Sequence, residues 1–535
     1  MPDQAAWKYH PPHTNAARMR IHGTTTTRVS RDWANVKKSF SQCPLRSWLP
    51  RTEADTVPHV AIIGGGFAGL RCADVLVRHN VKVTIFEARD RIGGRAYQIE
   101  SGGHLIDLGP NWIHGSKDNP IFQIASLVTT LELVEEPGAI FDGNGSQLKP
   151  EIAEWLSETM WQVVLDAFKY SDKNSQIIGS EQSLMNFFEA QIAALSPPTY
   201  ATETWAELQT LLMEMARTWG SYVGDSVESQ SLKFFYLEDC IDGETPFVAN
   251  TYRDIVKEVS KVAVARAEIL FNEKVISIQT NETHQAPAIT ISTAKGTTAT
   301  FDQVVVTCPL GWLKQHHESL FTPAIPPRLS LAIKNLNFGR LEKIYVTFPS
   351  AFWYSPGSPK VFDFLTPSYL PSSIPNSAKS SSTQSIISLA HLPAPYNQPT
   401  LLFYLYGPYA TAMVYAITPY APGSFEYTEA LLPYTQPFFS LLPNYNSLSP
   451  ACVPTAIYGS QWQNDDLAGN GSYTNFQIGL DGGDKDILCI RDGMPERGIW
   501  FAGEHTAPFF AVGTTTGAYW AGEQVARRIL SSESL

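Results

Sequence analysis

Three glycines, Gly64, Gly66 and Gly69, stand in G-x-G-x-x-G spacing directly after the apolar run at residues 60–63. Glycines in this pattern allow a tight turn, let the backbone approach a pyrophosphate, and let a helix pack closely on a strand. The start of the following helix adds partial positive charge and free N–H groups for phosphate. Glu87, further along, is placed to accept hydrogen bonds from ribose hydroxyls. These residues therefore predict that the chain binds a dinucleotide.

The elements that must position these glycines form a β-α-β unit. Residues 60–63 are typical of a short buried strand, residues 70–77 have helical periodicity, and residues 81–86 are a second apolar strand that ends at Glu87. Parallel strands joined by a helix predict an α/β fold. The glycine pattern by itself leaves NAD and FAD open as the dinucleotide.

Composition limits the classes of protein that the chain can be. It has 535 residues, of which 44% are hydrophobic, so we expect two to four domain-sized units. Its six cysteines are scattered without a C-x-x-C pair, which argues against a disulfide scaffold and a zinc site and fits a reducing compartment. We expect no metal. No stretch of eighteen or more apolar residues occurs, and we expect neither a membrane span nor a nucleic-acid partner.

Residues 1–55 differ from the rest of the chain. They hold nine Lys or Arg residues against four acidic residues, and they lack the apolar core of a secretory signal. We interpret them as a basic, disordered extension of a cytoplasmic protein; a mitochondrial transit peptide is the alternative. Without them the chain is more acidic than its net charge of -12, and such a charge can steer cationic substrates.

Five further strings carry a resemblance to a known family. Residues 87–95 read E-A-x-x-R-x-G-G-R, and residues 107–115 read D-L-G-x-x-W-I-H-G, followed by N-P-I-F at 119–122. Near the other end, residues 501–506 read F-A-G-E-H-T, and residues 517–522 read G-A-x-x-x-G. Together these strings resemble the flavin-dependent amine oxidase family, the polyamine oxidases in particular, over about residues 58–530.

The resemblance implies a fold and a division into domains. It implies a Rossmann-like FAD-binding domain of the amine-oxidase type, with an interleaved α+β substrate-binding domain. We expect the discontinuous FAD-binding domain at residues 56–125, 262–335 and 451–530, and the substrate-binding domain at 126–261 and 336–450. Residues 355 to about 400 are rich in Ser and Pro, and we interpret them as a long surface loop.

The resemblance also implies the cofactor and the residues that hold it. In monoamine oxidases a cysteine carries the flavin covalently; here Ser472 occupies that place, so we expect non-covalent FAD. We expect the helix that starts at Gly517 to aim N–H groups at the flavin. The expected cofactor-binding residues are Gly64, Gly66, Phe67, Ala68, Gly69, Glu87, Arg89, Gly94, Arg95, Asn111, Trp112, Val275, Gly503, Glu504, Thr514, Thr515 and Ala518.

Two residues are expected at the substrate. By resemblance His114 lies on the substrate side of the flavin, and Tyr473 is one wall of an aromatic cage around the amine. The implied partners are a small amine and O2. Hydride passes from the amine α-carbon to flavin N5, the imine is hydrolysed, and O2 is reduced to H2O2. One alternative is an FAD-dependent oxidase or desaturase of a non-polyamine metabolite, and another is a non-catalytic flavoprotein.

Two positions depart from the family pattern. Many members carry a lysine that hydrogen-bonds a water at flavin N5, and our register puts Leu329 at that position. The second wall of the aromatic cage is Thr514, with Phe509 or Phe510 as possible substitutes. These departures motivate the non-polyamine alternative. An NAD-only dehydrogenase is disfavoured because it leaves the C-terminal strings unexplained.

Overall fold

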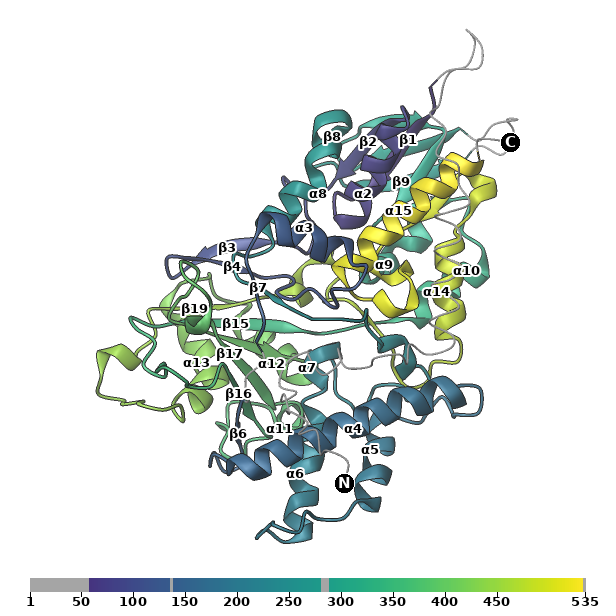
Figure 1. The fold of residues 1–535 in the computed structure, drawn as a ribbon. Helices are drawn as coiled ribbons and strands as arrows, with labels where there is room; N and C mark the ends of the chain where they lie inside the picture. Colours follow the sequence, from purple (N-terminus) through teal and green to yellow (C-terminus); the bar gives the residue numbers. More distant parts are fainter. Residues whose placement is uncertain (1–56, 135–137, 281–287, 533–535) are drawn as a thin grey trace, which may run out of the picture.

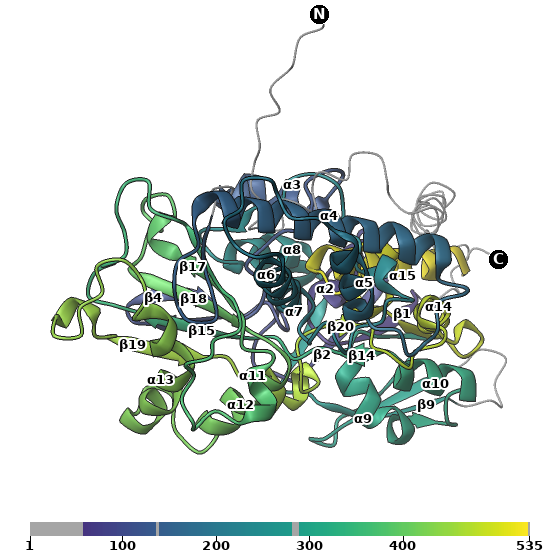
Figure 2. The same cartoon turned by 90° about the horizontal axis from the view of Figure 1, so that it is seen from below.

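The computed structural model describes residues 57–134, 138–280 and 288–532. The extension predicted for residues 1–55 lies outside the described residues. Two sheets dominate the fold, and Figures 1 and 2 show them well separated, the first beside α2 and α15 and the second beside α12 and α13. No helix of the described residues is long and apolar enough to cross a membrane.

The first sheet is parallel and has the strand order β21-β12-β1-β2-β8. Its strands are β1 (His59–Ile63), β2 (Lys82–Glu87), β8 (Glu268–Phe271), β12 (Gln303–Val306) and β21 (Ile499–Phe501). The predicted β-α-β unit is confirmed: helix α2 (Phe67–Arg78) joins β1 to β2. The sheet combines strands from both ends of the chain. Both of its faces are covered, and for this reason its strands are continuous apolar runs that are buried.

Helices cover this sheet. Helices α2 and α14 (Gly483–Asp492) contact its strands, and α3 (Pro120–Val128), α8 (Arg253–Arg266) and α15 (Thr515–Ser532) pack beside α2 and one another. Helix α9 (Leu310–Leu320) packs on β9 (Val275–Thr280) and β13 (Phe321–Thr322) of a smaller sheet, and α10 (Pro327–Asn335) packs on α9 and α14. The C-terminal helix α15 packs directly on α2, and Figure 1 shows the two side by side. A Cβ atom on Gly522 would lie 2.1 Å from the Ala68 carbonyl oxygen, so this glycine allows the close approach.

The second large sheet has six strands in the order β19-β15-β18-β17-β16-β6, and only its β16–β6 pair is parallel. Its strands are β6 (Ala139–Phe141), β15 (Glu342–Thr347), β16 (Val361–Phe364), β17 (Gln384–Ser388), β18 (Thr400–Leu405) and β19 (Ala456–Gly459). Helices α11 (Asn376–Lys379), α12 (Gly407–Ile417) and α13 (Phe425–Phe439) belong to this part, and a helical layer holds α4 (Pro150–Asn174), α5 (Leu184–Ala194), α6 (Trp205–Arg217) and α7 (Gly220–Val223).

The surface loop predicted for residues 355–400 is wrong. This segment contains β16 and β17, which are buried strands paired in antiparallel register. Phe362, Phe364 and Ile386 pack in the core between this sheet and α12 and α13. The strands are short and flanked by Ser and Pro, so composition averaged over the segment concealed them.

The remaining strands are short. A four-stranded sheet holds β9 (Val275–Thr280), β10 (Ile289–Thr293), β11 (Thr298–Phe301) and β13 (Phe321–Thr322). Three two-stranded pairs are β3 (Gln98–Ser101) with β4 (His104–Asp107), β5 (Leu131–Glu132) with β7 (Phe247–Val248), and β14 (Asn337–Phe338) with β20 (Thr474–Asn475).

Candidate active site

A cavity of about 340 Å³ lies at the carboxyl ends of the parallel strands. Ile63 and Gly64 line it at the end of β1, and Thr307 and Cys308 line it just after β12. In open α/β sheets, ligands bind at this edge. The structure brings every predicted site residue except Gly69 to the wall of this one cavity.

The glycines form a cradle with room for a ligand. A Cβ atom on Gly66 would meet nothing within 4 Å, so the space above this residue is open. Gly94 has φ +60° and lies against Gly66, because its Cβ would be 3.4 Å from the Gly66 Cα atom. Gly69 does not line the cavity; its Cβ would be 2.1 Å from the Gly64 carbonyl oxygen, so it allows α2 to pack against the turn. The first N–H groups of α2, at Phe67 and Ala68, border the cavity.

Glu87 ends β2 and is held by two backbone groups. Its carboxylate accepts hydrogen bonds from the Gly65 N–H at 2.7 Å and from the Arg89 N–H at 2.8 Å. The Arg89 side chain binds Asp465 at 2.7 Å and also borders the cavity. Glu87 is therefore fixed in position to accept further hydrogen bonds from a ligand.

Val275, at the start of β9, and Trp312, in α9, also line the cavity. The Trp312 indole N–H is buried and has no hydrogen-bond partner among the described residues. Buried donors are usually satisfied, so an acceptor on a bound ligand would complete this one. The cradle, the fixed carboxylate and this donor fit a dinucleotide.

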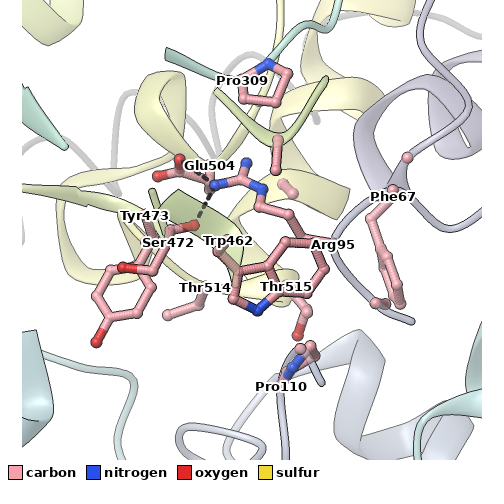
Figure 3. A pocket seen from close by; sticks show the side chains of 18 of the residues that line it. Phe67, Arg95, Pro110, Pro309, Trp462, Ser472, Tyr473, Glu504, Thr514 and Thr515 are labelled. Atoms are coloured by element: carbon pink, nitrogen blue, oxygen red, sulfur yellow. Dashed lines mark hydrogen bonds and ion pairs between the residues drawn. The ribbon is translucent and has the colours of Figure 1, made fainter. Parts of the chain in front are cut away.

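An ion pair joins the two ends of the chain across the cavity. Arg95 Nη1 donates to Glu504 Oε1 at 3.1 Å and to the Ser472 carbonyl oxygen at 2.6 Å, as Figure 3 shows. Glu504 is 4% exposed, and its other oxygen accepts a hydrogen bond from the Thr474 N–H. The arginine of the E-A-x-x-R-x-G-G-R string and the glutamate of the F-A-G-E-H-T string, 409 residues apart, thus form one structural unit.

The C-terminal motif differs from its prediction in two details. Helix α15 begins at Thr515, not at Gly517, and the Gly517 N–H donates to Thr514 Oγ1 at 2.9 Å. That N–H is therefore used inside the protein rather than aimed at a ligand. Phe509 and Phe510 are buried in the core and do not line the cavity, so neither replaces Thr514 as a cage wall.

Aromatic side chains surround one part of the cavity. Trp112 Nε1 donates to the Tyr404 hydroxyl at 3.0 Å, and the Tyr473 hydroxyl donates to the Tyr222 carbonyl oxygen at 2.7 Å. His114 and Glu238 line the same cavity, and we use the name aromatic wall for six of its lining residues: Trp112, His114, Tyr222, Glu238, Tyr404 and Tyr473. In Figure 3, Tyr473 and Phe67 lie on opposite sides of the view, with Thr514 and Trp462 between them.

The assignment of Leu329 to the lysine position is wrong. Leu329 lies in α10, is 3% exposed, and packs in the core instead of lining the cavity. The cavity does have a lysine in its wall, Lys343 of β15, besides Lys274 near its other end. Lys343 Nζ donates to the Gly109 carbonyl oxygen and to Asn111 Oδ1, which also accepts a hydrogen bond from the Tyr404 hydroxyl.

Two signals could have found Lys343. A lysine opens the otherwise apolar run at residues 343–346, and a cation in a buried strand calls for a partner or a function. It also follows Glu342, which is fully buried.

Burial perturbs the ionisable groups around Lys343. It lowers the pKa of the Lys343 ammonium below its usual value, although Asp107 and Glu342 oppose this change. Burial raises the pKa of the Asp107 carboxyl above its usual range, against a hydrogen bond from Gln98 and the charge of Lys343. Burial also raises the pKa of Glu342 to about 7, against hydrogen bonds from Ser460 and from backbone N–H groups. Of these three groups, Lys343 lines the cavity, and a perturbed ionisable group in a cavity is typical of an active site.

Glu238 was also missed. It lies at the end of η2 (Phe235–Glu238), just before the segment that packs on the His114 loop, where the Lys117 N–H donates to the Asp242 carbonyl oxygen. No local pattern marks a single carboxylate in this region, so only the packing of the segment against the loop places it in the aromatic wall.

Comparison with known proteins agrees with this geometry. Residues 67–530 match the family model described as flavin containing amine oxidoreductase, and residues 21–106 match a model described as pyridine nucleotide-disulphide oxidoreductase. The human peroxisomal N(1)-acetyl-spermine/spermidine oxidase is 26% identical over 524 residues, which is 90% of this chain and 96% of that protein. Polyamine oxidase 2 of Arabidopsis thaliana is 26% identical over 479 residues, 87% of this chain and 86% of that protein.

The first of these models spans most of the chain, from the helix after the glycine turn to the last turn of α15. Its match includes both halves of the cavity wall, and the parallel sheet beneath the cavity is the Rossmann type of FAD-binding fold. The chain therefore belongs to the flavin-containing amine oxidoreductase family, as an FAD-binding oxidoreductase that acts on amines.

Proposed function

We propose that this enzyme oxidises secondary amines of the polyamine class with a non-covalently held FAD. The observation that carries the choice of substrate is Glu238, a carboxylate in the aromatic wall beside the His114 loop. A chain with several ammonium groups needs an anion in the cavity to hold an ammonium group that does not react, whereas an uncharged metabolite does not. The names of the human and Arabidopsis relatives support the same class.

The predicted cofactor residues fit FAD, and we propose those roles for them. Gly66, the start of α2 and Arg95 would hold the pyrophosphate, and Glu87 would hold the ribose. Val275 and Trp312 would border the adenine. Ser472 offers no thiol for a covalent bond, which supports non-covalent binding.

We also propose the predicted division into an FAD-binding and an α+β substrate-binding domain, with two adjusted boundaries. Helix α8 crosses the predicted boundary between residues 261 and 262 but packs on α2, so the second FAD-binding segment begins at Arg253 in this proposal. Strand β19 falls inside the predicted FAD-binding segment 451–530, but it pairs with β15 of the six-stranded sheet. The third FAD-binding segment therefore begins after Gly459 in this proposal. The cytoplasmic location stays a prediction.

When bound, FAD supplies the redox chemistry: it accepts a hydride from the amine α-carbon and passes two electrons to O2, giving H2O2, and water hydrolyses the imine product. The protein must present the amine uncharged. For an alkylamine with a pKa of about 10.4, this costs roughly 4–5 kcal/mol at neutral pH. The apolar rings of Trp112, Tyr404 and Tyr473 favour the neutral form. His114 accepts the released proton at its imidazole.

We also propose Lys343 for the role of the lysine that, by the family resemblance, hydrogen-bonds a water at the flavin. Its Nζ is anchored by the Gly109 carbonyl oxygen and Asn111 Oδ1 and borders the cavity. Because burial lowers its pKa, it can exchange a proton with a bound water nearer to neutral pH than an exposed lysine can. This position removes one of the two reasons for the non-polyamine alternative. Thr514 is the other, and its hydroxyl is engaged with Ala511 and Gly517 at the start of α15.

Anaerobic mixing with a panel of amines tests the proposal. We expect spermine, N-acetylated polyamines or other secondary amines to bleach the flavin absorbance, and oxygen to restore it with release of H2O2. Acid precipitation should leave the FAD in the supernatant, because it is not covalently bound. A flavin that stays oxidised with every amine contradicts the proposed function, and a flavin that precipitates with the protein contradicts non-covalent binding.

A further inference from the structure

A second, smaller cavity lies against the aromatic wall of the first. Ser221, Tyr222 and Ser385 line both cavities. The second cavity has a volume of about 30 Å³, which is room for about two water molecules. The terminal carbon and nitrogen of an alkylammonium chain need about the same space.

Aromatic rings form one side of this small cavity. The ring centroids of Trp219 and Tyr222 are 5.0 Å apart in a stacked arrangement, and Trp161 meets Trp219 edge-on at 5.7 Å. Met160 and Met215 fill the neighbouring positions. The faces of indole rings attract cations, and thioether side chains adapt to the shape of what they contact.

A buried carboxylate completes the wall. Asp363 of β16 is 4% exposed and lines the small cavity. It stands opposite Ser385 of β17, whose hydroxyl donates to Asp363 Oδ1 at 2.8 Å. Among the described residues that line this cavity there is no Lys, Arg or His. The small cavity therefore combines a carboxylate with aromatic faces and few other polar groups. Asp363 is hydrogen-bonded to Ser385, which lines both cavities.

We propose that the small cavity binds the charged end group of the amine substrate. Asp363 would be the counter-ion of a terminal ammonium, and Trp161 and Trp219 would contribute cation–π contacts. With Glu238 in the main cavity, the enzyme then offers two carboxylates to two cationic nitrogens of one chain. This inference rests on the proposed function and narrows it to amines that keep a charged, unacetylated end.

The test uses two secondary amines of equal length, one ending in a primary ammonium and the other in a methyl group. In the wild-type enzyme, kcat/KM should be much higher for the ammonium-ended amine. The substitution Asp363→Asn keeps the shape of the side chain and an acceptor for Ser385 but removes the charge. We expect it to lower kcat/KM for the ammonium-ended amine roughly 30-fold or more, and to change that of the methyl-ended amine less than about threefold.

Trp161→Leu provides a second variant, since Trp161 lines only the small cavity and is partly exposed. It should lower kcat/KM for the ammonium-ended amine roughly 3- to 30-fold, the range of a lost cation–π contact, and spare the other amine. Asp486→Asn is the matched control for a lost buried carboxylate: Asp486 binds Arg328 and lines neither cavity. It should leave the preference between the two amines unchanged.

The outcomes separate this inference from the proposed function. If neither amine reduces the flavin, the proposed function itself fails. If both amines are oxidised but Asp363→Asn and Trp161→Leu lower their kcat/KM values equally, or leave the preference intact, the small cavity does not bind the end group. In that case, if Glu238→Gln abolishes the preference for the ammonium-ended amine, the charged end group binds in the main cavity instead.

Discussion

Replacement of Lys343 by methionine tests the most consequential assignment in the cavity. Methionine keeps an unbranched stem of similar length and removes only the ammonium group. The lost contacts are those of Nζ with Gly109, Asn111 and, at 3.4 Å, the Asp107 carbonyl oxygen. Asn111 Oδ1 keeps its hydrogen bond from the Tyr404 hydroxyl, so the loop retains one anchor. We therefore expect a folded enzyme that still binds FAD.

The expected decrease in the rate of reoxidation follows from the loss of a single charge-assisted hydrogen bond. If Lys343 holds the water that takes part in reoxidation, its loss removes about 1.5–3 kcal/mol from that step. At about 1.4 kcal/mol per tenfold, reoxidation by O2 should slow roughly 10- to 150-fold. Anaerobic reduction by the amine should change only a few-fold, because the aromatic wall that presents the amine is intact. The two rates are measured separately in a stopped-flow instrument, by mixing oxidised enzyme with amine and reduced enzyme with oxygen.

The pH dependence gives an independent readout. Because burial lowers the pKa of Lys343, the inflection that it contributes to the reoxidation rate should lie below the usual lysine value and should vanish in Lys343→Met. Lys314→Met is a matched control: its ammonium also has a pKa lowered by burial and donates to backbone carbonyls, but it lies in α9 outside the cavity. Reoxidation within about twofold of wild type in an FAD-loaded Lys343→Met enzyme would refute the assignment.

Three further predictions concern the cradle, a buried carboxylate and the aromatic wall. Gly66→Ala should weaken FAD binding and leave the thermal stability of the apoprotein unchanged, because its new Cβ meets no protein atom. Gly69→Ala should destabilise the apoprotein itself, because its new Cβ collides with the Gly64 carbonyl oxygen. Thermal unfolding scans and FAD titration separate the two effects. Because burial raises the pKa of Glu342 from 4.5 to about 7, the folded state binds this proton more tightly than the unfolded state. The stability that Glu342 contributes is therefore fully present below about pH 4.5 and falls by about 3 kcal/mol as pH rises to about 7. Denaturant unfolding should show that fall flattened in Glu342→Gln, and an unchanged slope would contradict the shift. Glu238→Gln should raise KM for spermine roughly tenfold or more with little change in kcat, and an unchanged KM in steady-state assays would argue against its role.

Much of the cofactor site was predictable because its chemistry is encoded locally. The roles of Gly64 and Gly66 depend on backbone conformation, and the role of Glu87 depends on its place at the end of a strand. Each of these properties follows from the spacing of residues along the chain. The family strings at the two ends extended this reading to Arg95 and Glu504. The same local logic predicted the β-α-β unit, because continuous apolar runs and helical periodicity are properties of neighbouring residues.

The substrate side was decided by tertiary structure. Lys343, Glu238 and Asp363 come from a strand, a short helical turn and a second strand that lie far apart in sequence, and no spacing rule relates them. The Ser- and Pro-rich segment that was expected to be a surface loop contributes Asp363 and Ser385 to buried strands, because pairing across the sheet supplies the burial that local composition did not indicate. Sequence alone thus determined that the chain binds a dinucleotide, since phosphate recognition uses backbone groups of contiguous turns, and the family strings identified that dinucleotide as FAD. Only the folded chain decided which charges face the amine, since those side chains meet through the packing of two sheets and a helical layer.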